Sequence, residues 1–527
     1  MSAEGREASV RKEEIMHVSK VLSLGVTFAL GVAAPTVHAK PKPDVSALTS
    51  LGKEVFFDTR LSDPPTQSCA SCHAAAAGWT SDDSFINERL VVVPGADPST
   101  SGGRRPPMAA YASFAPSFDA DGVGCFVPEG TEATDVIPGV ACVGGIFWDG
   151  RATGYGIGSE VFELPSCNDS VTAAFTQAYA DFLGPTADQA LGPFANPVEQ
   201  GLPIGETELA GAEAVCEGVA TSHYAKLYRE AWGTDLDCSP EGADLSFKRI
   251  AVAISAWEHS REVNQFSSKR DFAIAFDDDH EFPLTYFTEQ ENLGHDLFYG
   301  KAGCSGCHQG VPEGDDLFGD GSEPRQLYSD FAFHNLGIPA NWDLVAYDPE
   351  SPDIGLRMVT NRPEHNGAFR TPILRNLTSG TDKGLSKAYM HNGYFKTLEQ
   401  VVHFYNTAGV KDQCPVGTPV EVAMADDCWP PPENDGFIGI PFAFGALGLT
   451  DEEEAAIVAY LETLNDLSPV EAPTPPRVTH EHQPQKHVVS KKNPVAPKKH
   501  VAPKKPTAPK KHVAPQHTLH LRRHGRH

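Results

Sequence analysis

Two short motifs in the chain each contain two cysteines followed directly by a histidine. The sequence reads CASCH at 69–73 and CSGCH at 304–308, so both stretches follow the pattern C-x-x-C-H. This spacing lets both thiols of a motif bond to the vinyl groups of one haem while the following histidine ligates the iron. One copy would also fit a redox-active thiol pair, but two copies predict two covalently bound c-type haems. The predicted attachment residues are Cys69, Cys72, Cys304 and Cys307, and the predicted iron ligands are His73 and His308.

The other cysteines lie outside these motifs, at positions 125, 142, 167, 216, 238, 414 and 428. The pairs Cys125/Cys142 and Cys414/Cys428 are close in sequence, which makes both candidate disulfides. Because the number of remaining cysteines is odd, one thiol stays free or pairs elsewhere. None is predicted to be a catalytic nucleophile, since no neighbouring histidine would activate it.

The N-terminal region has the layout of an exported protein. Residues 16–39 combine a lysine, an apolar stretch and small residues near the end, which predicts a secretory signal peptide cleaved before Lys40. The preceding residues fit this layout poorly, so Met16 is the better start. An uncleaved anchor is the alternative, but the apolar stretch is shorter than a spanning helix. We therefore expect residues 1–39 to direct export to the periplasm, where disulfides persist.

Composition narrows the class of protein. The chain has 527 residues, with 42 basic and 70 acidic side chains and a formal charge of −28. This acidic excess argues against a nucleic-acid-binding protein, which needs a basic face. No stretch reaches the roughly 18 to 20 apolar residues of a spanning helix, so a multi-pass membrane protein is also excluded.

The C-terminal segment differs in composition from the rest. Residues 469–527 are rich in Pro, Lys, His and Val without apolar periodicity, which predicts a disordered tail. From Val470 onward the tail carries a charge of +11, which leaves −39 for the remainder. We expect this basic tail to be solvated, or to contact an anionic cell surface. Weak metal binding by its histidines is the alternative.

Between these segments the pattern favours a mainly α fold with long irregular loops. Helical periodicity is clearest in four stretches, at 245–272, 289–298, 398–405 and 451–464, and alternating strand patterns are nearly absent. Thr450 is the predicted N-cap of the last stretch. We expect two cytochrome c-like haem domains, an N-terminal one over 45–285 and a C-terminal one over 286–468.

Several segments resemble the bacterial dihaem cytochrome c peroxidase and MauG superfamily, and they occur in the family's order over most of 51–466. They are LGKEVFFDTRLSDPPTQSCASCH, FWDGRA, DQALGPFANPVEQ, FRTPILRN, AYMHNGYFKTLEQVVHFYN and LTDEEEAAIVAYLETLND. The resemblance implies a peroxide-reacting haem in the N-terminal domain and an electron-transfer haem in the C-terminal one. It also implies a tryptophan between the two haems.

The resemblance assigns roles to four residues. Trp148, in FWDGR, corresponds to the tryptophan that connects the two haems electronically. Gln189 and Glu199 match the family's distal pair, and a carboxylate above an open iron can move a proton between the two peroxide oxygens. Pro193, in the same segment, is expected to shape the haem pocket.

Two departures from the peroxidase pattern resemble MauG-like members. Many peroxidases of the family close the N-terminal iron with a loop histidine, but this chain has no histidine between 74 and 147. We therefore expect an open iron, with Met108 as the competing cap. Fourteen residues after His391, where peroxidases place an axial methionine, stands Tyr405. A phenolate ligand would favour ferric and higher oxidation states, and Met390 is the competing ligand.

The family's interhaem calcium is a third point of departure. Its asparagine ligand aligns with Arg105, and further oxygens are expected near Ser386 and Ala388. An arginine there would repel a divalent cation and could replace its charge. The resemblance therefore leaves calcium open.

Taken together, the resemblance implies a periplasmic dihaem peroxidase that reduces hydrogen peroxide at an open N-terminal haem. A small redox protein, such as a c-type cytochrome, would discharge the oxidising equivalents. A MauG-like oxidase that modifies a partner protein is the close alternative, because it would use the same residues. A non-enzymatic electron-transfer cytochrome is a third reading, which predicts six-coordinate iron at both haems. A surface-tethered metal-binding protein, acting through the tail, is a fourth.

Overall fold

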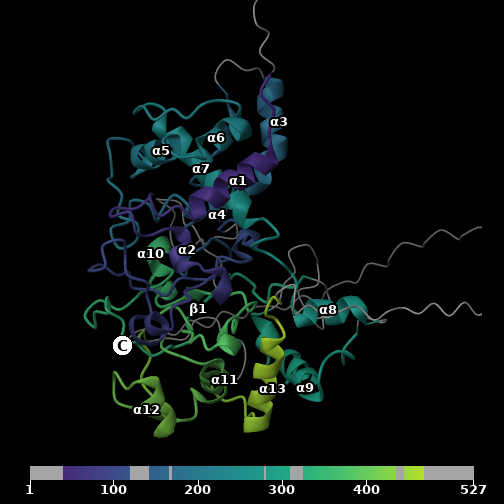
Figure 1. Ribbon diagram of the computed structural model, residues 1–527. Helices are drawn as coiled ribbons and strands as arrows, with labels where there is room; N and C mark the ends of the chain where they lie inside the picture. Colours follow the sequence, from purple (N-terminus) through teal and green to yellow (C-terminus); the bar gives the residue numbers. More distant parts are fainter. Residues whose placement is uncertain are drawn as a thin grey trace, which may run out of the picture. The chain divides into compact units, whose positions relative to one another are not determined.

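The computed structural model describes six stretches of the chain, coloured in Figure 1: residues 40–118, 142–164, 169–277, 281–308, 325–434 and 444–467. The predicted signal peptide, the predicted tail, Cys125 and Cys167 lie outside these stretches. Among the helices described, none is long and apolar enough to cross a membrane.

The N-terminal half is built around two crossing helices. Its helices are α1 (Val45–Phe56), α2 (Cys69–Cys72), α3 (Asp169–Tyr179), α4 (Pro185–Gln189), α5 (Ala212–Ala220), α6 (Ala225–Trp232) and α7 (Ala243–Glu258). Helix α1 packs on α7 and α6. A Cβ at Gly52 would lie only 1.8 Å from the carbonyl oxygen of Ala253, so the close crossing of α1 and α7 requires glycine there.

The C-terminal half repeats this arrangement with a second pair. Its helices are α8 (Lys269–Phe276), α9 (Glu289–Tyr299), α10 (Arg357–Thr360), α11 (Leu398–Thr407), α12 (Val420–Ala425) and α13 (Asp451–Glu462). Helices α9 and α13 pack side by side (Figure 1). Gly294 permits the contact, because a Cβ there would lie 1.9 Å from the carbonyl oxygen of Ala456.

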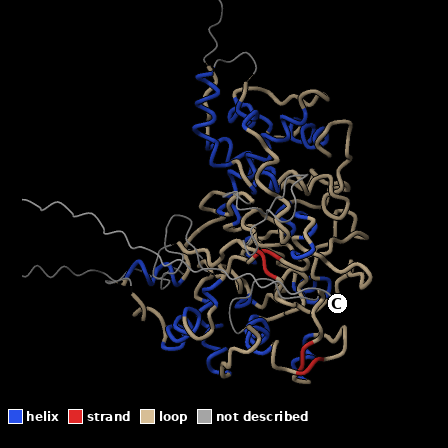
Figure 2. The backbone as a smooth tube through the Cα atoms, turned by 180° about the vertical axis from the view of Figure 1, so that it is seen from behind, coloured by secondary structure: helices blue, strands red, loops and turns tan. Residues whose placement is uncertain are grey.

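Strands contribute little to the described part, as Figure 2 shows. Strands β1 (Phe333–His334) and β2 (Phe369–Arg370) pair antiparallel, with Phe333 opposite Arg370. Strands β3 (Asp412–Gln413) and β4 (Cys428–Trp429) pair in parallel. The prediction of a mainly α fold with long loops is confirmed for these residues.

Two large hydrophobic cores lie along the chain. The first gathers buried residues from Ala47 to Val263, with Leu327 and Ile373 added from the C-terminal half. The second gathers buried residues from Ala273 to Leu464. Each core contains one of the two helix pairs. The exact domain boundaries at 285 and 286 stay predictions.

Three of the four predicted helices form with ends within two residues of the prediction. They correspond to α9, α11 and α13. Thr450 caps α13, because its side chain accepts a hydrogen bond from the backbone N–H of Glu453. The prediction of one continuous helix over 245–272 is wrong. Helix α7 ends at Glu258, where the side-chain amide of Asn264 donates to the Glu258 carbonyl at 2.8 Å.

The disulfides differ in part from the expectation. Cys414 and Cys428 are bonded as predicted and tie β3 to β4. Cys216 and Cys238 form a second disulfide that the sequence spacing did not suggest. Cys142 is also disulfide-bonded, and its predicted partner Cys125 lies outside the described residues.

Candidate haem pockets and distal site

The first C-x-x-C-H motif opens onto a cavity of about 1190 Å³ in the N-terminal half, here called the first cavity. Its thiols lie on α2, which the side chains of Ser68 and Ser71 cap. Residues predicted for this site that line the cavity are Cys69, Cys72, His73, Trp148, Gln189, Pro193 and Glu199.

The second motif lies between two cavities in the C-terminal half. The second cavity measures about 1230 Å³ and the third about 1000 Å³. Both are lined by Cys304, His308, Met390 and Tyr405, together with Trp148. A flat macrocycle attached at this motif would therefore have space on either side.

Both motif histidines are oriented by a backbone carbonyl. The Nδ1 atom of His73 lies 3.2 Å from the carbonyl oxygen of Trp79, and Nδ1 of His308 lies 2.9 Å from that of Tyr328. A proton on Nδ1 donates to the carbonyl and leaves the Nε2 lone pair free for a metal. Burial lowers the pKa of both imidazoles, which favours this neutral form.

The four motif thiols are free and largely enclosed. None is in a disulfide, although each pair is spaced as a redox pair would be. Burial raises the pKa of Cys72 to about 12 and that of Cys304 to about 12, so both are neutral thiols at physiological pH. Free thiols, a carbonyl-oriented imidazole and an adjoining large cavity fit the requirements of a c-type haem at each motif.

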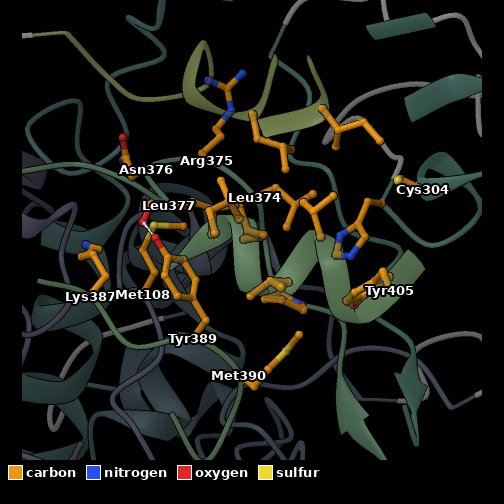
Figure 3. Close-up of a pocket in the computed structure, with 18 of the residues that line it drawn as sticks. Met108, Cys304, Leu374, Arg375, Asn376, Leu377, Lys387, Tyr389, Met390 and Tyr405 are labelled. Carbon is orange, nitrogen blue, oxygen red and sulfur yellow. Dashed lines mark hydrogen bonds between the residues drawn. The ribbon is translucent and has the colours of Figure 1, made fainter. Parts of the chain in front are cut away.

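Tyr405 and Met390 are the two candidates for the second axial ligand. Tyr405 projects from α11, and in Figure 3 it lies on the same side of the second cavity as Cys304, apart from Met390. Burial raises the pKa of Tyr405, and the nearby Cys307 and Cys304 thiols raise it further. Met390 has a positive φ of 64°, and its carbonyl oxygen accepts a hydrogen bond from the Arg105 side chain. Both side chains face the space where a haem would sit.

Trp148 lines the first, second and third cavities at once. Its indole N–H donates to the carbonyl oxygen of Arg105 at 2.8 Å, and its own carbonyl oxygen accepts from the N–H of Arg370 at 2.9 Å. The bend that follows needs glycine, because Gly150 has a φ of +75° and a Cβ there would lie 2.7 Å from the Phe333 ring. Trp148 is thus held between the cavities by one hydrogen bond from its indole N–H and one to its backbone carbonyl.

A tight turn brings the predicted distal pair to the same cavity. Gln189 is the last residue of α4, and Glu199 follows a turn in which the N–H of Glu199 bonds to the carbonyl of Asn196 at 3.0 Å. Pro193 closes the turn, since its carbonyl oxygen accepts from the N–H of Gln200 at 3.2 Å. The Asp188 carboxylate anchors α4 by accepting the N–H of Gly154 at 2.9 Å.

The electrostatic setting of Glu199 suits proton transfer. Burial raises the pKa of its carboxyl, while the charge of Arg151 and a hydrogen bond from the Asn196 side chain act in the opposite direction. The net shift is upward, so the group exchanges a proton more readily near neutral pH than an exposed glutamate does.

Glu199 and Gln189 also line a cleft beside the first cavity, here called the entrance cleft, which Arg151, Phe147 and Asn196 line as well. The Arg151 guanidinium lies 3.9 Å from the centre of the Phe147 ring. Arg151 is also held by Asp149, at 3.0 Å. The distal pair therefore stands between the cleft and the first cavity.

Within the described residues, His73 is the only histidine that lines the first cavity. Met108, the competing cap, lines the first and second cavities, and in Figure 3 its side chain lies beside Leu377 and Tyr389. No second imidazole is thus available from the described chain to close this site.

Sequence reasoning missed several residues of these sites. Glu258 lines the first cavity, is 5% exposed, and has its pKa raised to about 8 by burial. Arg104 lines the same cavity and pairs with Asp149 and Asp353, both at 2.6 Å. An apolar helix that ends in a charged residue was the only signal for Glu258. Nothing in the sequence pairs Arg104 with an aspartate some 250 positions away.

Comparison with known proteins supports this description. Residues 46–279 match the model of the family "Di-haem cytochrome c peroxidase". The methylamine utilization protein MauG of Paracoccus denitrificans is 28% identical over 452 residues, covering 83% of this chain and 93% of MauG. The cytochrome-c peroxidase IdrP2 of a Pseudomonas species is 26% identical, covering 84% of this chain and 90% of that relative.

A solved structure shows the same fold. The diheme peroxidase BthA from Burkholderia thailandensis is 24% identical, with a TM-score of 0.55 over 81% of this chain and 88% of that chain. These relatives are matched along most of their length. The N-terminal half of this chain thus matches the dihaem cytochrome c peroxidase family model, and most of the chain is similar to relatives named MauG and cytochrome-c peroxidase.

Proposed function

We propose that this protein is a periplasmic dihaem c-type peroxidase that reduces hydrogen peroxide at an open N-terminal haem. The observation that carries the proposal is the common placement of Glu199 and Gln189 on the first cavity and on the entrance cleft. The four motif thiols attach the haems, and His73 and His308 ligate the irons. When bound, a haem supplies an iron centre that accepts peroxide and stores oxidising equivalents.

Glu199 serves as the proton carrier of the reaction. Two protons and two electrons convert one hydrogen peroxide to two water molecules, so a group at the distal side must move protons between oxygens. The Glu199 carboxylate takes a proton from one oxygen and returns it to the other. The Gln189 amide, on the same wall, orients the peroxide by donating and accepting hydrogen bonds. The charge of Arg151 opposes the rise in the Glu199 pKa that burial causes.

Trp148 and Tyr405 are proposed to transfer and to store the oxidising equivalents, respectively. Trp148 lies against all three cavities, so it shortens the path between the two redox centres. As a phenolate ligand of an iron held at the second motif, Tyr405 would stabilise ferric and higher states. A small redox protein then discharges the equivalents, and the acidic body of the chain would attract a basic donor.

A MauG-like oxidase is the second candidate, in which a partner protein is the electron source. Tyr405 on the second and third cavities favours this reading, because a tyrosine ligand makes the second haem a store of oxidising equivalents rather than a donor.

Turnover assays test the two candidates. Holoenzyme with peroxide should oxidise a reduced c-type cytochrome with many turnovers if it is a peroxidase. Oxidation of candidate partner proteins without cytochrome turnover would favour the oxidase. No reaction with peroxide, together with two low-spin irons, would overturn both and favour an electron-transfer cytochrome.

A further inference from the structure

Arg105 occupies the wall that separates the first and second cavities, and its side chain lines both. Its backbone N–H donates to the carbonyl oxygen of His391 at 2.8 Å, and its Nε donates to that of Met390 at 3.1 Å. Its guanidinium carbon lies 5.5 Å from the centre of the Trp148 ring. The arginine is therefore fixed beside the residue that connects the two haem sites.

The charge of Arg105 is not neutralised by the surrounding chain. No ion pair joins it to a carboxylate in the described part of the protein. Burial lowers its pKa to about 10, so the guanidinium remains a cation at neutral pH. In addition, none of the described residues that line the second cavity is an aspartate or glutamate.

A second basic side chain stands nearby: burial and the charge of Arg105 lower the pKa of Lys387 to about 7, so its amine is only partly charged at neutral pH. Lys387 is 4% exposed and donates from Nζ to the carbonyl oxygen of Ala77 at 2.7 Å, and it also lines the second cavity. Arg370 lines that cavity as well, is 6% exposed, and has Nε and one terminal nitrogen without a hydrogen-bond partner. The second cavity is thus lined by two guanidinium groups, of Arg105 and Arg370, and by the Lys387 amine.

A divalent ion does not fit among these groups. Calcium takes six to eight oxygen ligands, with carboxylates among them. Here the Met390 oxygen accepts from Arg105, the Ala77 oxygen from Lys387, and the Ser386 oxygen from the side-chain amide of Asn87 at 2.8 Å. Each of these three backbone oxygens already accepts an N–H donor, and the Arg105 cation and the Lys387 side chain line the same cavity.

We propose that the Arg105 guanidinium is a fixed cation between the two haem sites that takes the place of a divalent metal ion, so that this chain links its haems without calcium. The N–H groups of Arg105 that face the cavities are suited to bind a haem carboxylate. The positive charge of Arg105 near the Trp148 ring also disfavours a cationic indole radical. The oxidising equivalent therefore passes through the tryptophan and does not accumulate on it. The proposal rests on two haems filling the cavities and does not depend on peroxide turnover.

Calcium content gives the first test and needs no variant. Holoenzyme treated with a chelator and dialysed should hold far less than one calcium per chain. Its two ferric resonance signals and both midpoint potentials should be the same before treatment, after treatment and after excess calcium chloride. Stoichiometric calcium, or signals that change with the chelator and return with calcium, would overturn the proposal.

Charge removal gives the second test, on oxidised and reduced holoenzyme without peroxide. Arg105→Gln keeps amide donors but loses the charge, and at a fixed applied potential its ferrous-to-ferric ratio should fall roughly tenfold, as expected for one unit charge at about 10 Å in a medium of effective dielectric about 20. Arg105→Lys should stay within about twofold of the wild type. An Arg105→Gln protein with wild-type potentials would contradict the proposal, whatever its peroxidase activity.

Discussion

The indole N–H of Trp148 donates a hydrogen bond of 2.8 Å to the backbone carbonyl oxygen of Arg105. This bond fixes a tryptophan that lines the first, second and third cavities to the segment that forms the wall between them. One side chain and one backbone group therefore lie between these cavities, and the proposed role of each can be tested separately.

Replacing Trp148 with phenylalanine tests the path between the haems. The ring still fills space, but the hydrogen bond to Arg105 and the larger π system are lost. We expect oxidation of the external donor to slow at least about tenfold, equivalent to roughly 1.4 kcal/mol in the barrier, while the initial reaction with peroxide is nearly unchanged. Rapid-mixing spectroscopy measures both steps. Trp257→Phe is the matched control, because Trp257 is buried in the first core and lines none of the three cavities.

Replacing Glu199 with glutamine removes the proposed proton carrier. The rate of the peroxide step should fall by roughly 10² to 10⁴, the usual contribution of a positioned acid or base. In the wild type the carboxylate must be ionised to accept a proton, and burial raises its pKa above the ordinary 4.5. The wild-type rate should thus fall as pH drops through a value above 4.5, and this acid limb should vanish in the variant. Glu206→Gln, at an exposed position, should keep the wild-type profile.

Glu258 gives a prediction about stability and pH. Its pKa is raised from 4.5 to about 8 by burial in the folded protein, so between these values the folded state holds a proton that the unfolded chain has released. The free energy of unfolding should therefore decrease as pH rises through this window. Relative to the wild type, the free energy of unfolding of Glu258→Gln should rise by about 3 kcal/mol between pH 5 and pH 8.

Urea unfolding of holoprotein at several pH values measures this difference. Glu230→Gln, at an exposed position of α6, is the control and should follow the wild type at every pH. A constant difference between Glu258→Gln and the wild type across the range would show that the carboxyl is ionised in the folded protein.

Arg104 is expected to stabilise the contact between the two halves of the described chain. Its guanidinium bonds to Asp149, which is fully buried, and makes two bonds to Asp353, at 2.6 and 2.7 Å. Arg104→Met leaves the buried Asp149 carboxylate without its main partner, and it should lower the free energy of unfolding by about 3 to 5 kcal/mol. Arg229→Met breaks an exposed ion pair with Asp235 and should cost less than about 1 kcal/mol. Equal effects of the two changes would refute this account.

The parts of the fold that could be predicted from sequence are those fixed by neighbouring residues. Each thiol motif spans five consecutive positions. Helix α13 is predicted by its Thr450 N-cap and its acidic first turn. Amphipathic periodicity located α9 and α11 for the same reason. These signals depend on local geometry alone, which the sequence displays directly.

The parts that could not be predicted depend on distant contacts. The break after α7 is made by Asn264, whose amide bonds to the Glu258 carbonyl and whose oxygen accepts the N–H of Tyr111 at 2.5 Å. The Cys216–Cys238 disulfide links α5 to the loop after α6, and no pattern in the sequence indicates this pairing. The distal pair was found only through the family resemblance, because a glutamate in a loop is usually a solvated charge.

The coordination of the two irons is the central claim, and electron paramagnetic resonance of the oxidised holoprotein tests it most directly. The account predicts one high-spin ferric signal, from an open haem at the first cavity, and one low-spin signal, from a haem ligated by His308 and Tyr405. In Tyr405→Met the low-spin signal should change while the high-spin signal stays. Two low-spin signals in the wild type, or a low-spin signal unchanged by Tyr405→Met, would contradict the account.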